Sequence, residues 1–257
     1  GSGLVGSEMC IETANVSGFV GGKFGWKIAY LLHLYAVIPL ILFAVFIPDQ
    51  PLVESKQKKA NAPTQKGDLS PMIFVYTLAG MAAFMLIQVM WSNTSLWVTG
   101  TLGGTVAQAG MASGMMSLFS CIGRLFFGKI YGKLGRFTIH LDLALLIVGM
   151  AIASHSHSYA MALVALAFVG VSMALTAPAA LNRCIEISPR CQSAQSITSI
   201  GFALGNFGST YWKLFVGKFG DGTLNSVFRV NSYFTVAVLV IAFGISAVLI
   251  SREKKAQ

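Results

Sequence analysis

The sequence predicts an all-α membrane protein that crosses the bilayer about eight times. Hydrophobic residues make up 55% of its 257 positions and charged residues only 11%, whereas soluble domains carry roughly a quarter charged residues. Positions 71–123 contain no Asp, Glu, Lys or Arg, and Asp142 is the only charged residue in 137–182. Because a helix needs about 20 mostly apolar residues to cross a bilayer, these stretches indicate several spans.

The predicted membrane helices occupy, in order, positions 4–24, 26–47, 72–97, 106–128, 137–154, 158–181, 194–216 and 230–250. The first is the least apolar because it contains Glu8 and Glu12, and we expect the long third helix to tilt or break near Asn93. Positions 48–70 are polar, with four lysines, and predict a solvated linker. The predicted domains are therefore two helices in 1–47, the cytoplasmic linker 48–70 and a six-helix bundle in 71–257.

The distribution of Lys and Arg predicts the orientation. If successive loops alternate sides, one side holds the linker, the stretch GKIYGKLGR at 128–136, the loop at 183–190 and the C-terminal tail. That side carries twelve of the 18 Lys and Arg residues and the other side carries five. The positive-inside rule places the richer side and both termini in the cytoplasm. We expect 128–136 to form a tight cytoplasmic loop whose glycines permit a sharp turn.

A short internal repeat predicts the larger architecture. GGKFG at 21–25 and VGKFG at 216–220 each close one predicted helix and precede another apolar helix. The first helix pair thus corresponds to the seventh and eighth helices, which makes the repeat unit six helices long. A six-helix repeat with a lysine-rich linker between the halves predicts a transporter of twelve helices, built from two six-helix units. We expect this chain to supply the last two helices of the first unit and all of the second, without the first four helices.

Three motifs carry a resemblance to a known family. Gly128, Lys133, Gly135 and Arg136 match the pattern Gly, three residues, Asp, basic residue, any residue, Gly, Arg, with Gly132 in place of the Asp. GFVGG at 18–22, followed by Trp26, matches the end of the family's fifth helix, and EISPR at 186–190 matches the end of its tenth. The sequence therefore resembles the major facilitator superfamily of secondary transporters, from the fifth helix to the C-terminus.

The resemblance implies a secondary active transporter in the plasma membrane. Such a protein moves a small solute or drug across the membrane by rocking two helical bundles, and we expect a proton or other ion gradient to drive it. The glycine-rich motif of the fifth helix suggests multidrug efflux. It also implies a cytoplasmic gate, in which Arg136 reaches Glu186 with Arg124 close by. The alternative for Lys129, Lys133 and Arg136 is contact with anionic lipid headgroups. The gate candidates are Arg124, Gly128, Lys133, Gly135, Arg136 and Glu186.

Polar residues inside the predicted spans are candidates for solute binding or ion coupling. Glu8, Glu12 and Asn15 share one helix face, and a buried carboxylate there would bind and release a proton; the alternative is a headgroup or vestibule position. Gln88, Trp91 and Asn93 suit a central cavity or interhelical hydrogen bonds. Asn206 and Tyr211, on the predicted helix 194–216, are also cavity candidates. We expect Trp212 and Lys213 to be an interfacial anchor and Asp142 to be a helix-start residue.

Other functions have little support in the sequence. No phosphate loop, metal-ligand spacing or nucleophile–base set is present, so we expect no enzyme activity, no metal and no cofactor. Cys10, Cys121, Cys184 and Cys191 show no disulfide pattern. The expected partners are a small-molecule substrate, protons or another coupling ion, membrane lipid, and the missing N-terminal helices or a second copy, but no nucleic acid. The alternatives to a transporter are a passive channel and a non-transporting membrane interaction protein.

Overall fold

A computed structural model describes residues 70–188 and 192–255, together with the short segments 27–28, 34, 37–38 and 41–42. In 70–188 and 192–255 the regular secondary structure is helical throughout. The six α-helices are α5 (Pro71–Leu96), α6 (Val106–Leu134), α7 (Thr138–Ser154), α8 (Tyr159–Ile187), α9 (Gln192–Gly217) and α10 (Leu224–Lys255). A π-helical segment, η2 (Trp97–Thr101), continues α5, and a 3₁₀ turn, η3 (Gly135–Phe137), joins α6 to α7. The predicted all-α fold is confirmed.

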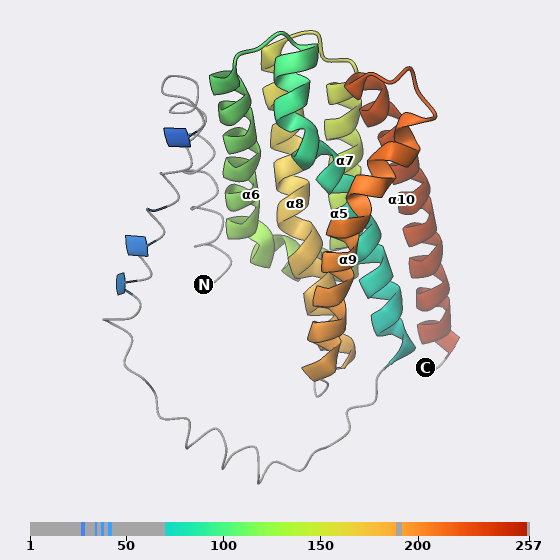
Figure 1. The fold of residues 1–257 in the computed structure, drawn as a ribbon. Coiled ribbons are helices and arrows are strands. Elements are labelled where there is room, and N and C mark those ends of the chain that lie inside the picture. The colour runs from blue at the N-terminus through green and yellow to red at the C-terminus, as the bar shows by residue number, and fades with distance from the viewer. Residues whose placement is uncertain are drawn as a thin grey trace.

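The six helices run alternately up and down, as Figure 1 shows. The start of α5, the η3 turn, the α8–α9 connection and the end of α10 lie at one end of the bundle. We call this the basic end, because Lys133, Arg136 and Arg183 lie there. Helix α8 packs against α6, α7 and α5, while α9 packs mainly on α5 and α10 on α7. Segments that are distant in sequence therefore share one core.

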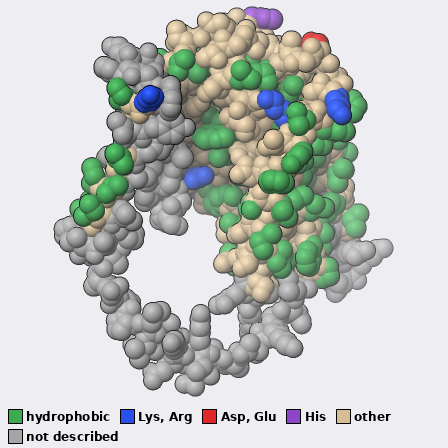
Figure 2. Space-filling view, viewed as in Figure 1, with side chains coloured by type: hydrophobic (Ala, Val, Ile, Leu, Met, Phe, Trp, Pro, Cys, Tyr) green, Lys and Arg blue, Asp and Glu red, His purple; other side chains and the backbone are tan. Residues whose placement is uncertain are grey.

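Four stretches of the described chain are long and apolar enough to cross a membrane: Pro71–Thr101, Val106–Ser154, Tyr159–Ile187 and Leu224–Val248. The second stretch contains both α6 and α7. Large hydrophobic side chains are exposed along α9 and α10, and Figure 2 shows many of them on the visible face. Apolar surface facing outward is what lipid requires. The chain is a multi-pass membrane protein.

The stretch at 128–136 differs from the expected loop. Its first seven residues continue α6 to Leu134, and the turn is confined to η3. Gly135, at the junction, has a φ of +50°, a conformation that favours glycine. Gly128 and Gly132 are helical, so they do not form the turn. Lys133 lies in the last turn of α6, where a positive charge is favourable beside the exposed carbonyl groups.

Helix α5 does not break at Asn93. The Asn93 side chain donates to the carbonyl of Val89 at 2.6 Å, and the Thr94 hydroxyl donates to that of Met90 at 2.8 Å. Both polar groups are thus satisfied within a continuous helix. The departure from α-geometry comes four residues later, where η2 begins at Trp97. Helix α8 likewise continues through Pro178 to Ile187, because tertiary packing tolerates proline in membrane helices.

Small residues allow the closest helix contacts. A Cβ added at Gly205 of α9 would lie 2.7 Å from the carbonyl oxygen of Met81 on α5, and one added at Gly201 would lie even closer to the side-chain methyl of Thr77. Between α6 and α8, Gly123 packs on Ala174 and Gly170 on Met116. Glycines at four-residue spacing permit such approach. Gly201 and Gly205 therefore let α9 lie close against α5.

Candidate functional site

Two side-chain amides meet halfway along the α5–α9 contact. Gln88 of α5 donates through Nε2 to Oδ1 of Asn206 on α9, at 2.7 Å. The Gln88 side chain is buried, with a residue exposure of 8%, whereas Asn206 is exposed. Gln88 Oε1 is buried and has no hydrogen-bond partner. This amide pair therefore leaves one acceptor and the Asn206 N–H donors available to a ligand.

Asn93 and Lys213 form a second polar contact between the same two helices. The Lys213 ammonium donates to Asn93 Oδ1, while Asn93 Nδ2 is held by the helix carbonyl described above. Asn93 is buried and Lys213 is half-buried. An ammonium has three N–H donors, so this contact does not exhaust Lys213. We call Gln88, Asn93, Asn206 and Lys213 the α5–α9 polar cluster.

Lys213 has no carboxylate partner among the described residues. The described side-chain carboxylates are engaged elsewhere: Asp142 by hydroxyls, Glu186 by an arginine and Asp221 by Thr223. Trp212 donates through Nε1 at 2.9 Å to Asn231, which is fully buried between the helices, and its expected role as an interfacial anchor stays a prediction. The positive charge of Lys213 faces the polar cluster.

The remaining cavity candidates take different places. Trp91 packs against the buried core and is not part of the polar cluster. Tyr211 is 62% exposed and pairs with Phe207, with ring centroids 5.6 Å apart. The candidates Glu8, Glu12 and Asn15 lie outside the described residues. In the described part of the chain, no three His, Cys, Asp or Glu side chains are grouped as metal ligands are.

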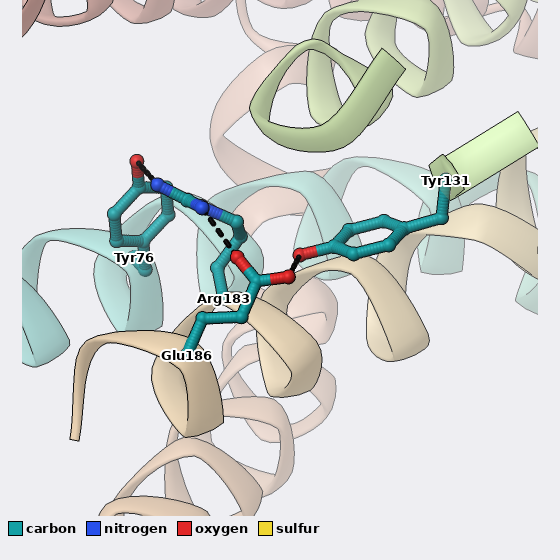
Figure 3. Close-up of polar contacts among 4 residues, drawn as sticks. All are labelled: Tyr76, Tyr131, Arg183 and Glu186. Atoms are coloured by element: carbon teal, nitrogen blue, oxygen red, sulfur yellow. Dashed lines mark hydrogen bonds and ion pairs between the residues drawn. The ribbon is translucent and has the colours of Figure 1, made fainter. Parts of the chain in front are cut away.

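A second network joins three helices at the basic end, as Figure 3 shows. Tyr131 of α6 donates to Glu186 Oε1 at 2.8 Å, and Arg183 pairs with Glu186 Oε2. Arg183 also donates to the Tyr76 hydroxyl of α5 at 3.4 Å and lies 5.3 Å from its ring centroid. The network therefore pairs one positive charge, on Arg183, with one negative charge, on Glu186. It fastens the end of α8 to α5 and α6.

The expected gate, in which Arg136 pairs with Glu186, stays a prediction; in the structure Glu186 pairs with Arg183. Arg183 lies three residues before Glu186, a spacing that brings two side chains together on a helix and could have identified the pair. No motif or spacing in the sequence singled out Tyr76 or Tyr131 as partners of this pair. Gly128 and Lys133 are exposed on α6, and Arg124, Gly135 and Arg136 are half-buried. Lys129 and Lys133 line a cavity of about 580 Å³ with Ile122, Gly123, Phe126, Ile130 and Val171.

Asp142 is not the expected helix-start residue at the membrane surface. Helix α7 begins at Thr138, and the Asp142 carboxylate is fully buried against α8. Its Oδ1 accepts from Ser172 at 2.5 Å and its Oδ2 accepts from Thr176 at 2.8 Å. Ser172 and Thr176 are one helical turn apart, which places both hydroxyls on the same face of α8. The sequence interpretation missed this site because nothing marked Ser172 and Thr176.

Comparison with known proteins identifies the family. The family model of the Major Facilitator Superfamily matches residues 14–212, which is most of the chain. No curated protein matches the sequence. The matched region includes α5–α8, most of α9 and the motifs at 18–22, 128–136 and 186–190. The helical bundle, its membrane-length segments and this match lead to one conclusion: the chain belongs to the major facilitator superfamily and is a membrane transporter.

Proposed function

We propose that the protein is a secondary active transporter that moves a small solute by alternating access, driven by a gradient of protons or another ion. The observation that carries the proposal is the amide pair, in which Gln88 Oε1 is buried without a partner beside the exposed Asn206. An unsatisfied buried acceptor costs about 1–3 kcal/mol. A solute that donates a hydrogen bond to Gln88 and accepts one from Asn206 would recover this free energy.

The position of Lys213 favours a solute that also carries an acidic group. It lies seven residues after Asn206 on α9, which corresponds to about 10 Å along the helix axis. The charge is half-buried and has no described carboxylate partner, so an anionic group would be attracted to it more strongly than in water. The proposed solute is therefore small and polar at one end, with a carboxylate or similar anion at the other.

The remaining parts of the mechanism belong to the same proposal. The network of Tyr76, Tyr131, Arg183 and Glu186 supports rocking of the bundle as one body, because it prevents α8 from separating at the basic end. Arg124, Lys133 and Arg136 would contact the other bundle on the cytoplasmic side of the plasma membrane. A proton or cation site would be supplied by Glu8, Glu12 and Asn15. Coupling to such an ion gradient would allow the protein to export drugs.

Solute uptake into proteoliposomes tests the proposal. The purified protein would be reconstituted and given an imposed pH gradient, with radiolabelled organic acids, their neutral amides and the matching amines as probes. We expect saturable, gradient-dependent uptake of acids. Replacement of Gln88 by Met or of Asn206 by Leu should raise KM about tenfold each, as loss of one hydrogen bond predicts.

The controls separate the possible failures. Gln195→Met makes the same chemical change at an exposed position of α9 and should leave KM unchanged. The double variant Gln88→Met/Asn206→Leu should be little worse than the poorer single variant, because the two amides act together. Flux that rises linearly with solute concentration and ignores the gradient would indicate a passive channel. Preference for the amines would refute the acidic solute but leave the transporter intact.

A further inference from the structure

Asp142 is the one fully buried carboxylate in the described bundle. It lies in the α7–α8 interface, and its only hydrogen-bond partners among the described residues are the hydroxyls of Ser172 and Thr176. No Lys, Arg or His of the described chain pairs with it. The two hydroxyls can satisfy the carboxylate oxygens, but they carry no charge. A full negative charge at this position would remain uncompensated inside the membrane.

Electrostatics limits how such a group can exist. An isolated ion in a medium of low polarity is strongly disfavoured, and a carboxyl group in that position becomes neutral by binding a proton unless a cation reaches it. Two charge-neutral hydroxyl donors partly stabilise the ionised form. The ionised and the protonated form of Asp142 are therefore similar in free energy. A buried carboxyl group without hydrogen-bond donors would favour the protonated form, and one paired with arginine would favour the ionised form.

The Thr176 hydroxyl has a second acceptor already in place. Its oxygen lies 2.8 Å from Asp142 Oδ2 and 3.1 Å from the carbonyl oxygen of Ser172, one turn earlier in α8. The hydroxyl has one hydrogen, so it donates fully to one of them at a time. When Oδ2 carries a proton, the new O–H can donate to Thr176 Oγ1 while the Thr176 hydroxyl donates to Ser172. No side chain needs to move.

We propose that Asp142, Ser172 and Thr176 form a proton-binding site between α7 and α8, in which the proton binds Oδ2 and reverses the hydrogen bond to Thr176. Ser172 donates to Oδ1 in both states. The ligand is a proton, and its binding changes only the hydrogen bonds of Thr176. The site is separate from the α5–α9 polar cluster, and it would bind its proton whether or not transport of the solute is driven by ions.

Other titratable groups around α7 are engaged or distant. On α7 itself, His140 lies 3.3 Å from the Ser246 hydroxyl of α10. On α8, Arg183 and Glu186 pair with each other, and Arg183 also holds Tyr76 of α5. The remaining described titratable side chains of the neighbouring elements are Cys121, Arg124, Lys129, Tyr131 and Lys133 on α6, Arg136 on η3, Tyr159 and Cys184 on α8, and Arg229 and Tyr233 on α10. None of them contacts the Asp142 carboxyl in the described structure.

Infrared spectroscopy can observe the proton directly. The whole protein in lipid nanodiscs would be titrated with acid, and the carbonyl band of a protonated carboxyl group recorded in difference spectra. We expect one band to grow as the pH falls, to be lost in Asp142→Asn and to be retained in Asp221→Asn, which changes an exposed carboxylate. Circular dichroism would establish that each variant is folded.

The hydroxyl variants distinguish a proton site from a packing contact. Ser172→Ala removes the hydrogen bond to the carbonyl oxygen, so the band should move to higher wavenumber. Thr176→Val removes the acceptor of the new O–H and should produce a smaller shift, which Thr176→Ser should reverse. A band that does not change with pH, one that persists in Asp142→Asn, or the lack of any such band at every pH at which the protein is folded would overturn the proposal. Because no solute is used, the result is independent of the transport assay.

Discussion

Individual carboxylates in this bundle are stabilised in three different ways. Asp142 accepts from two hydroxyls in the core, Glu186 binds an arginine and a tyrosine at the basic end, and Asp221 accepts from Thr223, the residue just before α10. The difference follows from the surroundings, because a charge near water needs less compensation than one inside the membrane. The three carboxylates therefore differ in how fully their negative charge is compensated.

Asp221 provides a pH prediction with a definite sign. The Thr223 hydroxyl and backbone N–H both donate to Asp221 Oδ1, at 2.6 and 3.0 Å, and these bonds hold the pKa of this carboxyl below its ordinary value. A depressed pKa means that the folded state favours the ionised form. The resulting stabilisation is fully present above the ordinary value of about 3.9, and it is lost as the pH falls through the pKa of the folded state.

Replacement of Asp221 by Asn should therefore lower the melting temperature at about pH 7 and have a smaller effect at about pH 3. Fluorescence-monitored unfolding in detergent would measure both values. Ser251→Ala, an exposed change near the other end of α10, is the control and should behave like the natural protein at both pH values. An equal loss at both pH values would mean that the Asp221 charge contributes nothing.

The polar residues of the site could be predicted singly but not in their pairings. Gln88, Asn93 and Asn206 stood out because polar side chains are rare in apolar helices. Their partners depend on how α9 is rotated against α5, which no local pattern specifies. Asp142 was misinterpreted for the same reason: its position four residues after the start of α7 suggested the membrane surface, whereas its neighbours on α8 place it in the core.

Among the helices, the α5–α9 contact depends most directly on residue size. Gly205→Ala would place a methyl group 2.7 Å from a backbone carbonyl oxygen, which requires the helices to separate. Overpacking of this kind costs about 1–3 kcal/mol, more than the roughly 1 kcal/mol that alanine gains over glycine as a helix former. We expect a lower melting temperature and a lower yield of folded protein from Gly205→Ala.

Gly217→Ala provides the matched control on the same helix. A Cβ at Gly217 meets no atom within 4 Å, so the substitution should leave the melting temperature unchanged or raise it slightly. Both variants would be compared by size-exclusion chromatography and thermal unfolding. Similar behaviour of the two variants would show that α9 is not packed against α5 as closely as described.

Helix positions were predicted more accurately than helix ends. Each of the six described helices overlaps its predicted range, because runs of about 20 apolar residues have few alternatives in a membrane. The errors lie at the ends: α6 and α8 continue six residues further, and α10 starts six residues earlier. Charged residues and glycines suggested loops there, but helices extend beyond the hydrocarbon region, where water and headgroups solvate lysine and arginine.

For the whole molecule, the distribution of charge predicts which end of the bundle faces the cytoplasm. The basic end contains η3 and the end of α10, and the opposite end contains the exposed His155 and His157. The positive-inside rule places the basic end in the cytoplasm. After the four native cysteines are replaced, His157→Cys should react with a membrane-impermeant maleimide in intact cells. Ser251→Cys should react only after permeabilisation, and the reverse pattern would contradict the orientation.

The family and the six-helix bundle could be anticipated from hydropathy and three short motifs, since both depend on features that are local in sequence. The division into two bundles could not be tested in the same way. Most of residues 1–47 and most of the linker 48–70 lie outside the described residues, so the predicted domains and the correspondence of GGKFG with VGKFG stay predictions. The solute is likewise a property of side chains from several helices rather than of any motif.

The arrangement of α6, α7 and α8 also constrains how the protein is made. A turn of only three residues joins α6 to α7, yet both helices make their main contacts with α8, which the ribosome produces later. The two helices must therefore enter the membrane as a hairpin whose inner surfaces face lipid until α8 arrives. Gly123 and Gly149, which α8 covers in the finished bundle, are exposed during that interval. Synthesis that stalls before α8 would leave an open hairpin as a substrate for membrane quality-control proteases.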